Sequence, residues 1–198
     1  ILHMLRNYLG DDAFFAGLSD YLKTNEYGTG EAHQLRLSLE KVSGKDLNWF
    51  FNQWYFGKGY PKLEVKSTFD PMKKQVTINV AQTQEEKFEF PLSIDVLENG
   101  KISRKEVWVN AKAKNDFVFD VTKNPELINA NPEGLLLSDI KQDKTPEQLF
   151  LQYTTAKDLY SKYTAIEEAK DQVSKNPFAD KLYAAALKDK FYRNRLLA

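Results

Sequence analysis

The sequence predicts a multidomain protein whose α-helical and β-strand segments follow one another along the chain. Apolar residues recur at helical spacing up to an aromatic segment that ends at Gly59-Tyr60-Pro61. From there to residue 140 they alternate with polar residues, and then helical spacing returns. These changes of period predict a helical unit over residues 1–60, a seven-stranded β-sandwich over 61–141 and the start of a helical repeat domain over 142–198.

The composition is that of a packed and electrically neutral protein. Hydrophobic residues fill 42% of the 198 positions and aromatic residues 13%, which is ample for a core. The 28 basic residues balance 28 acidic ones, which removes the electrostatic case for nucleic acid or an anionic membrane surface. No apolar run is long enough to span a bilayer, and without cysteine there is no disulfide or thiolate. We expect no nucleic-acid partner and no membrane span, and bacterial cytoplasm and periplasm are both compatible.

Four short helices are predicted in the first sixty residues. They are Ile1–Leu9, a second helix capped by Asp11 or Asp12, a third from about Glu31 to Gly44, and a fourth capped by Asp46. The segment from Asp46 to Pro61 holds seven aromatic residues in sixteen positions, so it must lie inside a packed structure. Its apolar stripe is Leu47, Phe50, Phe51 and Trp54. For the remaining aromatics, core packing is favoured over a sugar or peptide groove (Trp49, Tyr55, Phe56 and Tyr60).

Seven short strands follow, which is the pattern of a sandwich with one face of each strand buried. The predicted strands are Leu63–Phe69, Val76–Val80, Phe88–Val96, Ile102–Val109, Phe117–Val121, Leu127–Ala130 and Leu135–Ile140. The Asn99-Gly100 pair is a strong signal for a two-residue hairpin.

The last segment reads as helix from Thr145 onward. Thr145 and Gln148 are spaced as a capping box, with Pro146 in the first turn. The pattern breaks near Asn176-Pro177. A weak internal repeat at an offset of 31 residues suits stacked helical pairs of the solenoid type, with Lys157-Asp158-Leu159-Tyr160 aligned on Lys188-Asp189-Lys190-Phe191.

No catalytic, cofactor-binding or metal-ligating residue is predicted in this chain. The two histidines, His3 and His33, lack the His-Glu-x-x-His spacing of a zinc peptidase, and structural or surface roles are expected for both. There is no nucleophile elbow and no phosphate-binding loop. The paired carboxylates at 11–12, 85–86 and 167–168 are expected to cap helices or to face solvent rather than to perform acid–base chemistry.

The order of motifs in residues 1–61 resembles M1-family zinc aminopeptidases of the aminopeptidase N type. The opening residues resemble the segment directly after the catalytic tyrosine in that family, with Ile1-Leu2-His3-Met4-Leu5-Arg6, then Leu9-Gly10-Asp11 and Phe14. The family pattern continues in order with Ser43-Gly44, Asp46-Leu47, Phe50-Phe51, Trp54 and Gly59-Tyr60-Pro61. The resemblance implies the end of an α-helical, thermolysin-like catalytic domain, then a β-sandwich, then HEAT- or armadillo-like repeats.

The resemblance also implies a parent enzyme that removes N-terminal residues from peptide substrates with zinc. Its zinc ligands and catalytic residues are implied to lie upstream of Ile1, so no cofactor is expected here. Both chain ends read as cut helices, and the missing N-terminal catalytic region of the same polypeptide is the expected partner. The alternative is a binding or scaffold protein, either a catalytically inactive M1 relative or an unrelated module of β-sandwich and helical repeat.

Overall fold

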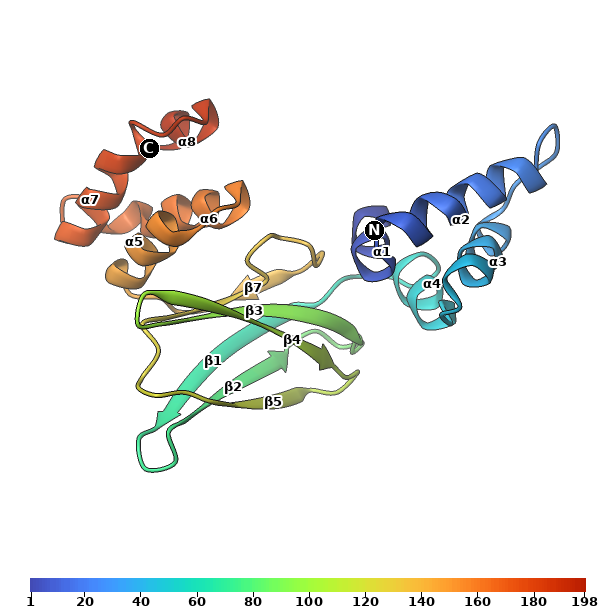
Figure 1. Ribbon diagram of the computed structural model, residues 1–198. Helices are drawn as coiled ribbons and strands as arrows, with labels where there is room; N and C mark the ends of the chain where they lie inside the picture. Colours follow the sequence, from blue (N-terminus) through green and yellow to red (C-terminus); the bar gives the residue numbers. More distant parts are fainter. The chain divides into compact units, whose positions relative to one another are not determined.

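The computed structural model describes residues 1–198, which form two compact units, residues 1–61 and 62–198 (Figure 1). The predicted mixture of α and β segments is confirmed, with eight α-helices and seven strands in two sheets. No helix combines the length and the apolar character that crossing a membrane requires.

The first unit contains four helices. Their bounds are α1 (Leu2–Leu9), α2 (Asp11–Thr24), α3 (Ala32–Ser43) and α4 (Asn48–Trp54). The longest two, α2 and α3, pack against each other, and α1 contacts α2. Gly44 ends α3 with a φ of 68°, a left-handed conformation that glycine adopts at little cost.

Two predicted helix caps are wrong by about one residue. Gly10 occupies the N-cap of α2, so Asp11 and Asp12 lie in its first turn. Leu47 occupies the N-cap of α4, while the Asp46 carboxylate accepts the N–H of Asn48 at 2.8 Å. A carboxylate is favourable both at the cap and in the first turn, because unpaired N–H groups and the positive end of the helix dipole meet there. An aspartate in the sequence therefore predicts the first residue of a helix only to within one position.

The helices α2 and α3 approach closely at Gly17. A Cβ atom there would lie 2.6 Å from Cδ2 and 3.1 Å from Cα of Leu39, which is fully buried. We expect Gly17→Ala to destabilise the first unit by about 1 kcal/mol net, because the clash exceeds the gain in helix propensity. Urea unfolding measures this. In a Leu39→Ala background, which removes Cδ2, the same change should cost less, and a stabilised single variant would contradict the packing argument.

The second unit begins with two sheets. The strands are β1 (Lys62–Asp70), β2 (Gln75–Gln82), β3 (Phe90–Glu98), β4 (Lys101–Val109), β5 (Lys114–Asp120), β6 (Leu127–Ala130) and β7 (Asp139–Lys141). Their order is β5-β2-β1-β7 in one sheet and β4-β3-β6 in the other. All neighbours are antiparallel except β1 and β7. The hairpin at Asn99-Gly100 is confirmed, because both residues have positive φ (52° and 70°) as a primed turn requires.

The predicted strand Leu135–Ile140 is wrong in most of its length. Only Asp139–Lys141 pairs as a strand, and residues 131–138 form a loop. The Asn131 side chain accepts the Leu136 N–H and donates to the Leu136 carbonyl, both at 3.0 Å. One amide thus provides the bonds that a neighbouring strand normally supplies. Within this loop Gly134 has a φ of 63°, and a Cβ atom there would lie 2.8 Å from the Tyr160 ring.

The helices α5 (Pro146–Thr155), α6 (Leu159–Ala169), α7 (Pro177–Ala186) and α8 (Tyr192–Leu197) follow, with a short 3-10 turn at Lys170–Gln172. The capping box of Thr145 and Gln148 is confirmed. Helix α5 packs against α6, α7 and the strand β6, and the orange helices α5 and α6 lie side by side in Figure 1. Small residues permit the close helix contacts of their core, which is built from Leu149, Tyr153, Ala165, Ile166, Ala169, Ala179, Leu182 and Ala186.

Candidate functional site

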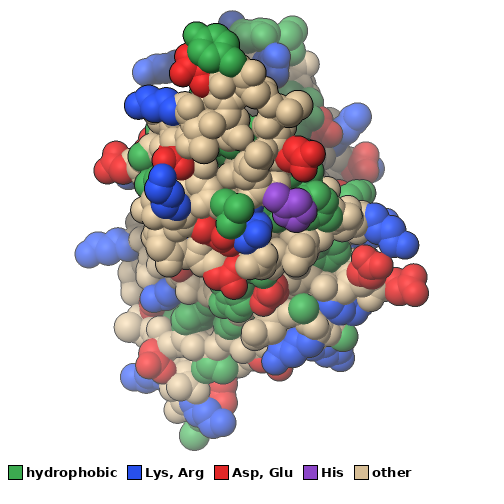
Figure 2. Space-filling view, turned by 90° about the vertical axis from the view of Figure 1, so that its right-hand side faces the viewer, with side chains coloured by type: hydrophobic (Ala, Val, Ile, Leu, Met, Phe, Trp, Pro, Cys, Tyr) green, Lys and Arg blue, Asp and Glu red, His purple; other side chains and the backbone are tan.

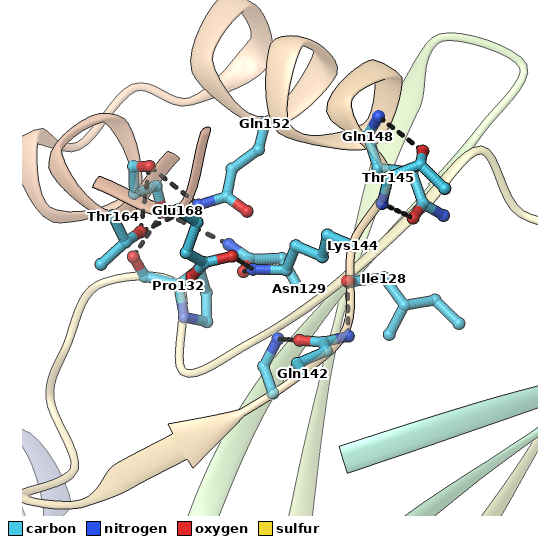
Figure 3. Close-up of polar contacts among 12 residues, drawn as sticks. Ile128, Asn129, Pro132, Gln142, Lys144, Thr145, Gln148, Gln152, Thr164 and Glu168 are labelled. Carbon is cyan, nitrogen blue, oxygen red and sulfur yellow. Dashed lines mark hydrogen bonds and ion pairs between the residues drawn. The ribbon is translucent and has the colours of Figure 1, made fainter. Parts of the chain in front are cut away.

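An extended polar site joins the sheets to the helices of the second unit. We call it the junction cluster, and it comprises Ser161 together with Asn129, Gln142, Lys144 and Glu168, which are labelled in Figure 3. These residues come from β6, from the linker that enters α5, and from α6. All of them except Ser161 line a cavity of about 80 Å³, which is lined also by Tyr160 and Thr164.

Gln142 acts at the open side of β6. Its Nε2 donates to the Ile128 carbonyl at 2.8 Å, and its Oε1 accepts the Ala130 N–H at 3.2 Å (Figure 3). A backbone peptide of an adjacent strand would make the same two bonds. The side chain therefore caps a strand edge that would otherwise leave two polar groups unpaired.

Lys144 places a buried ammonium beside this edge. Its side chain is only 6% exposed, and Nζ donates to Asn129 Oδ1 at 3.0 Å. Glu168 Oε2 lies 3.8 Å from Nζ. Burial lowers the pKa of Lys144 and raises that of Glu168, and in each case the opposite charge reduces the shift. Desolvation is the larger cause of both shifts, and the Glu168 side chain is 41% exposed, so we expect this ion pair to add little net stability.

A chain of hydrogen bonds continues from the strand into the helices. Asn129 Nδ2 donates to Ser161 Oγ at 3.4 Å, and that hydroxyl donates to the Pro132 carbonyl. The buried Gln152 of α5 donates to the Ser161 carbonyl at 2.8 Å and to Thr164 Oγ1 at 2.9 Å. The network thus connects β6, the loop after it, α6 and α5, so its evident role is to set the orientation of the helices on the sheet.

The same substitution at two nearby glutamines tests the junction cluster. Gln142→Glu removes the donor that pairs with the Ile128 carbonyl and places a carboxylate there, so we expect a loss of about 1–3 kcal/mol. Gln148→Glu is the matched control, because Gln148 uses its Oε1 as acceptor for the Thr145 N–H. Glutamate serves a capping box equally well, so the control should be near neutral. Equal effects of the two changes in thermal unfolding would contradict the assignment.

The two histidines, for which structural or surface roles are expected, lie outside the junction cluster. His3 is exposed on α1, and His33 is exposed on α3, where its ring stacks on Phe56 with centroids 4.9 Å apart. No three His, Cys, Asp or Glu side chains converge in a way that could hold a metal ion, so the residues of this chain do not fit a zinc site. That the chain holds no catalytic or cofactor-binding residue stays a prediction.

The carboxylate pairs have mixed surroundings. Asp11 accepts two bonds from Arg6, each 2.8 Å, and Glu85 and Glu86 are exposed in a loop. Glu168 differs, because it faces the buried Lys144. Sequence reasoning missed this contact and the whole junction cluster. Nothing local in the sequence distinguishes Lys144 from other polar linker residues, since its burial comes from α6.

The aromatic segment is divided between core and surface. Its predicted stripe is confirmed, because Leu47, Phe50, Phe51 and Trp54 are all at most 5% exposed. Core packing is wrong for the residues that follow the stripe, with Tyr55 58%, Phe56 49% and Tyr60 38% exposed. They lie at the end of α4 and beyond it, where the chain no longer keeps one face toward the core.

Figure 2 shows acidic and basic side chains interspersed over one face of the molecule, as expected for a neutral chain.

Comparison with known proteins agrees with the fold. Residues 1–54 match the peptidase family M1 domain. The chain is 28% identical over 152 residues to aminopeptidase N of Lactococcus lactis subsp. lactis, which covers 72% of this chain and 18% of that protein. It is 40% identical over 65 residues to tricorn protease-interacting factor F2 of Thermoplasma volcanium, covering 33% of this chain and 8% of that protein.

A solved structure extends the likeness to nearly the whole chain. The crystal structure of Legionella pneumophila aminopeptidase A in complex with aspartic acid matches with a TM-score of 0.80. The match covers 96% of this chain and 24% of that one, at 20% identity, so it supports the fold. The resemblance to M1-family aminopeptidases predicted from the sequence is confirmed. The chain spans about a fifth of the length of its aminopeptidase N relatives.

Proposed function

We propose that the chain is the non-catalytic C-terminal portion of a zinc-dependent aminopeptidase that removes N-terminal residues from peptides. One observation carries the proposal: the match to the M1 domain at residues 1–54 is followed by sheets and helices that superpose on a solved aminopeptidase. Zinc in the intact parent supplies a Lewis acid and an activated water. The residues of this chain hold and orient their own elements and contribute no ligand to it.

We further propose that the two sheets form a β-sandwich spacer and that α5 to α8 begin a HEAT- or armadillo-like repeat. The sandwich is supported by a side-chain contact between the two sheets, in which the Lys105 ammonium of β4 lies over the Phe119 ring of β5, 5.7 Å from its centroid. Gln82 of β2 also bonds the N–H and the carbonyl of Phe88, at 2.9 and 2.7 Å, and so holds the connection that leads into β3 of the other sheet. The repeat is supported by α5 and α7, which both begin with proline after a side-chain cap, at positions 146 and 177. This spacing equals the offset of 31 in the sequence.

The test uses the full-length polypeptide that contains this chain. We expect it to hydrolyse aminoacyl-p-nitroanilides, to lose that activity with a chelator and to recover it with zinc. The partner of residues 1–61 would then be the upstream catalytic region, which the peptide substrates contact. A full-length protein without chelator-sensitive activity would contradict the proposal. The 198-residue chain alone should bind no stoichiometric zinc by elemental analysis.

The second candidate is a binding or scaffold function. It is favoured by the similarity to tricorn protease-interacting factor F2, since the name of that protein describes an interaction. A catalytically inactive M1 relative would keep the fold described above without its chemistry. The upstream sequence separates the two, because an intact His-Glu-x-x-His with a later glutamate favours the enzyme.

A further inference from the structure

The strand β1 has an edge that its own sheet leaves open. It spans Lys62–Asp70, but its outer neighbour β7 pairs only with residues 62–64. In an antiparallel pair such as β1 and β2, alternate residues direct their N–H and C=O groups away from the partner. Within residues 65–70 these outward groups have no strand beside them.

The inward side chains of β1 become exposed in the same part of the strand that lacks an outer neighbour, residues 65–70. Leu63, Val65, Ser67 and Phe69 all point inward, because their partners on β2 are buried. Leu63 and Val65 are 2% exposed, but Ser67 is exposed and Phe69 is half-buried. Opposite Ser67, Ile78 of β2 is fully buried. The interior is therefore closed over β2 and open beside the second half of β1.

A cleft of about 570 Å³ occupies this opening, and we call it the lateral cleft. The β1 edge forms one wall, with Ser67 and Phe69. The cleft is also lined by Pro125 and by Ile128 of β6, and by Gln142 and Gln148 from the linker and from α5. The capped edge of β6 limits the cleft, because Gln142 already satisfies Ile128 and Ala130 there. Of the two strands that line the cleft, β1 therefore offers unpaired main-chain groups and β6 does not.

We propose that the lateral cleft binds an uncharged, extended peptide segment of a partner polypeptide, which adds to β1 as a further strand. Main-chain groups of an edge strand are matched best by another extended main chain. The half-buried Phe69 and the small exposed part of the buried Ile128 suit a β-branched or other apolar side chain directed inward. The neighbouring Asp143 and Lys144 have opposite charges, so they favour no charged ligand.

The other outer strands are less suited to this role. Across the sandwich, Lys105 of β4 lies over the Phe119 ring of β5, 5.7 Å from its centroid, and fills the gap between the sheets. Strand β4 also carries four charged residues, and charges on an edge strand protect it from pairing with another strand (Lys101, Arg104, Lys105 and Glu106). The whole of β1 also carries four charged residues (Lys62, Glu64, Lys66 and Asp70), but residues 65–69, which lie beyond its pairing with β7, carry only Lys66. A strand of a second folded copy has its own neighbours and does not fit a cleft walled on both sides.

The binding test uses fluorescently labelled acetyl-Thr-Val-Thr-Val-Thr-amide and the chain as described. We expect saturable binding by anisotropy and slower amide hydrogen exchange at residues 65–70. A peptide that adds to β1 pairs through the N–H groups of only one of its edges. We therefore compare a peptide N-methylated at residues 2 and 4 with one N-methylated at residues 1, 3 and 5, and we expect them to bind unequally. One of the two should abolish binding. Equal binding of all three peptides, or no protection of 65–70 at millimolar peptide, overturns the proposal.

Two matched variants locate the binding. Ser67→Lys places a charge at the inward position beside the lateral cleft, and we expect affinity to fall at least about tenfold. Ser103→Lys is the control, because Ser103 is an exposed serine at an inward position of β4, and affinity should stay within about twofold. Equal losses in both variants overturn the assignment to β1. If the wild-type chain self-associates and Ser67→Lys abolishes that association, the proposal is also overturned, because a second copy of the chain then occupies the lateral cleft.

Discussion

Replacing Trp54 by alanine is expected to lower the free energy of unfolding of residues 1–61 by about 3–5 kcal/mol. Trp54 is 5% exposed and packs against Phe50, with ring centroids 6.4 Å apart. It ends the apolar stripe of α4, which the buried Leu47 begins. Loss of the indole leaves a cavity, and a unit of about sixty residues has few other core side chains that could repack to fill it.

The neighbouring Tyr55 provides the control. It is 58% exposed, so Tyr55→Ala removes an aromatic ring from the same helix end without opening a buried cavity. Urea unfolding followed by the far-UV circular dichroism of the isolated chain should resolve the first unit. An unchanged midpoint for Trp54→Ala, or equal losses for both variants, would show that the stripe does not form the core of this unit.

Asp189→Asn is expected to destabilise the helices of the second unit by about 3 kcal/mol. The Asp189 side chain is 6% exposed. It accepts the Tyr153 hydroxyl at 2.6 Å and the Phe191 N–H at 2.8 Å, and Lys162 Nζ lies 3.3 Å away. The asparagine side chain has only one acceptor oxygen, so it can keep one of these hydrogen bonds. It carries no charge, so the Lys162 ammonium loses its counter-charge. Tyr153→Phe removes one of the bonds, and the double variant measures their coupling.

The same residue predicts a dependence on pH. Burial raises the pKa of Asp189, but hydrogen bonds from Tyr153 and Phe191 outweigh it and hold that pKa well below its usual value. A lowered folded-state pKa contributes stability that is complete above the unfolded-state pKa of about 3.9 and is lost as the pH falls below it. Wild-type stability should therefore decline more steeply than that of Asp189→Asn from about pH 5 downward. Parallel declines would remove Asp189 as the cause.

Local signals predicted much of this fold, and long-range contacts explain the rest. The turn at Asn99-Gly100, the strand Leu127–Ala130 and the capping box at Thr145 each depend on neighbours within a few residues, and each is confirmed. The strand at Leu135–Ile140 failed because the Asn131 side chain satisfies the Leu136 backbone in place of a partner strand.

The junction cluster was beyond prediction for the same physical reason. Lys144 and Glu168 are far apart in the chain, and each alone reads as an exposed charge. Only the packing of α6 beside β6 and the linker buries the ammonium and turns it toward Asn129. The aromatic residues after Trp54 illustrate the opposite error, because their apolar character predicted burial that the end of α4 does not provide.

The loop at residues 131–138 bears on how this protein can be labelled. Gly134 lies under the Tyr160 ring, and Asn131 and Pro132 are bonded to Leu136 and Ser161. An inserted tag or reporter there would separate the loop from α6. The loop at Tyr27, which is fully exposed, makes no comparable contacts with its ring and suits an insertion. A fluorophore attached there can report on residues 1–61 without disturbing the helices that follow the sheets.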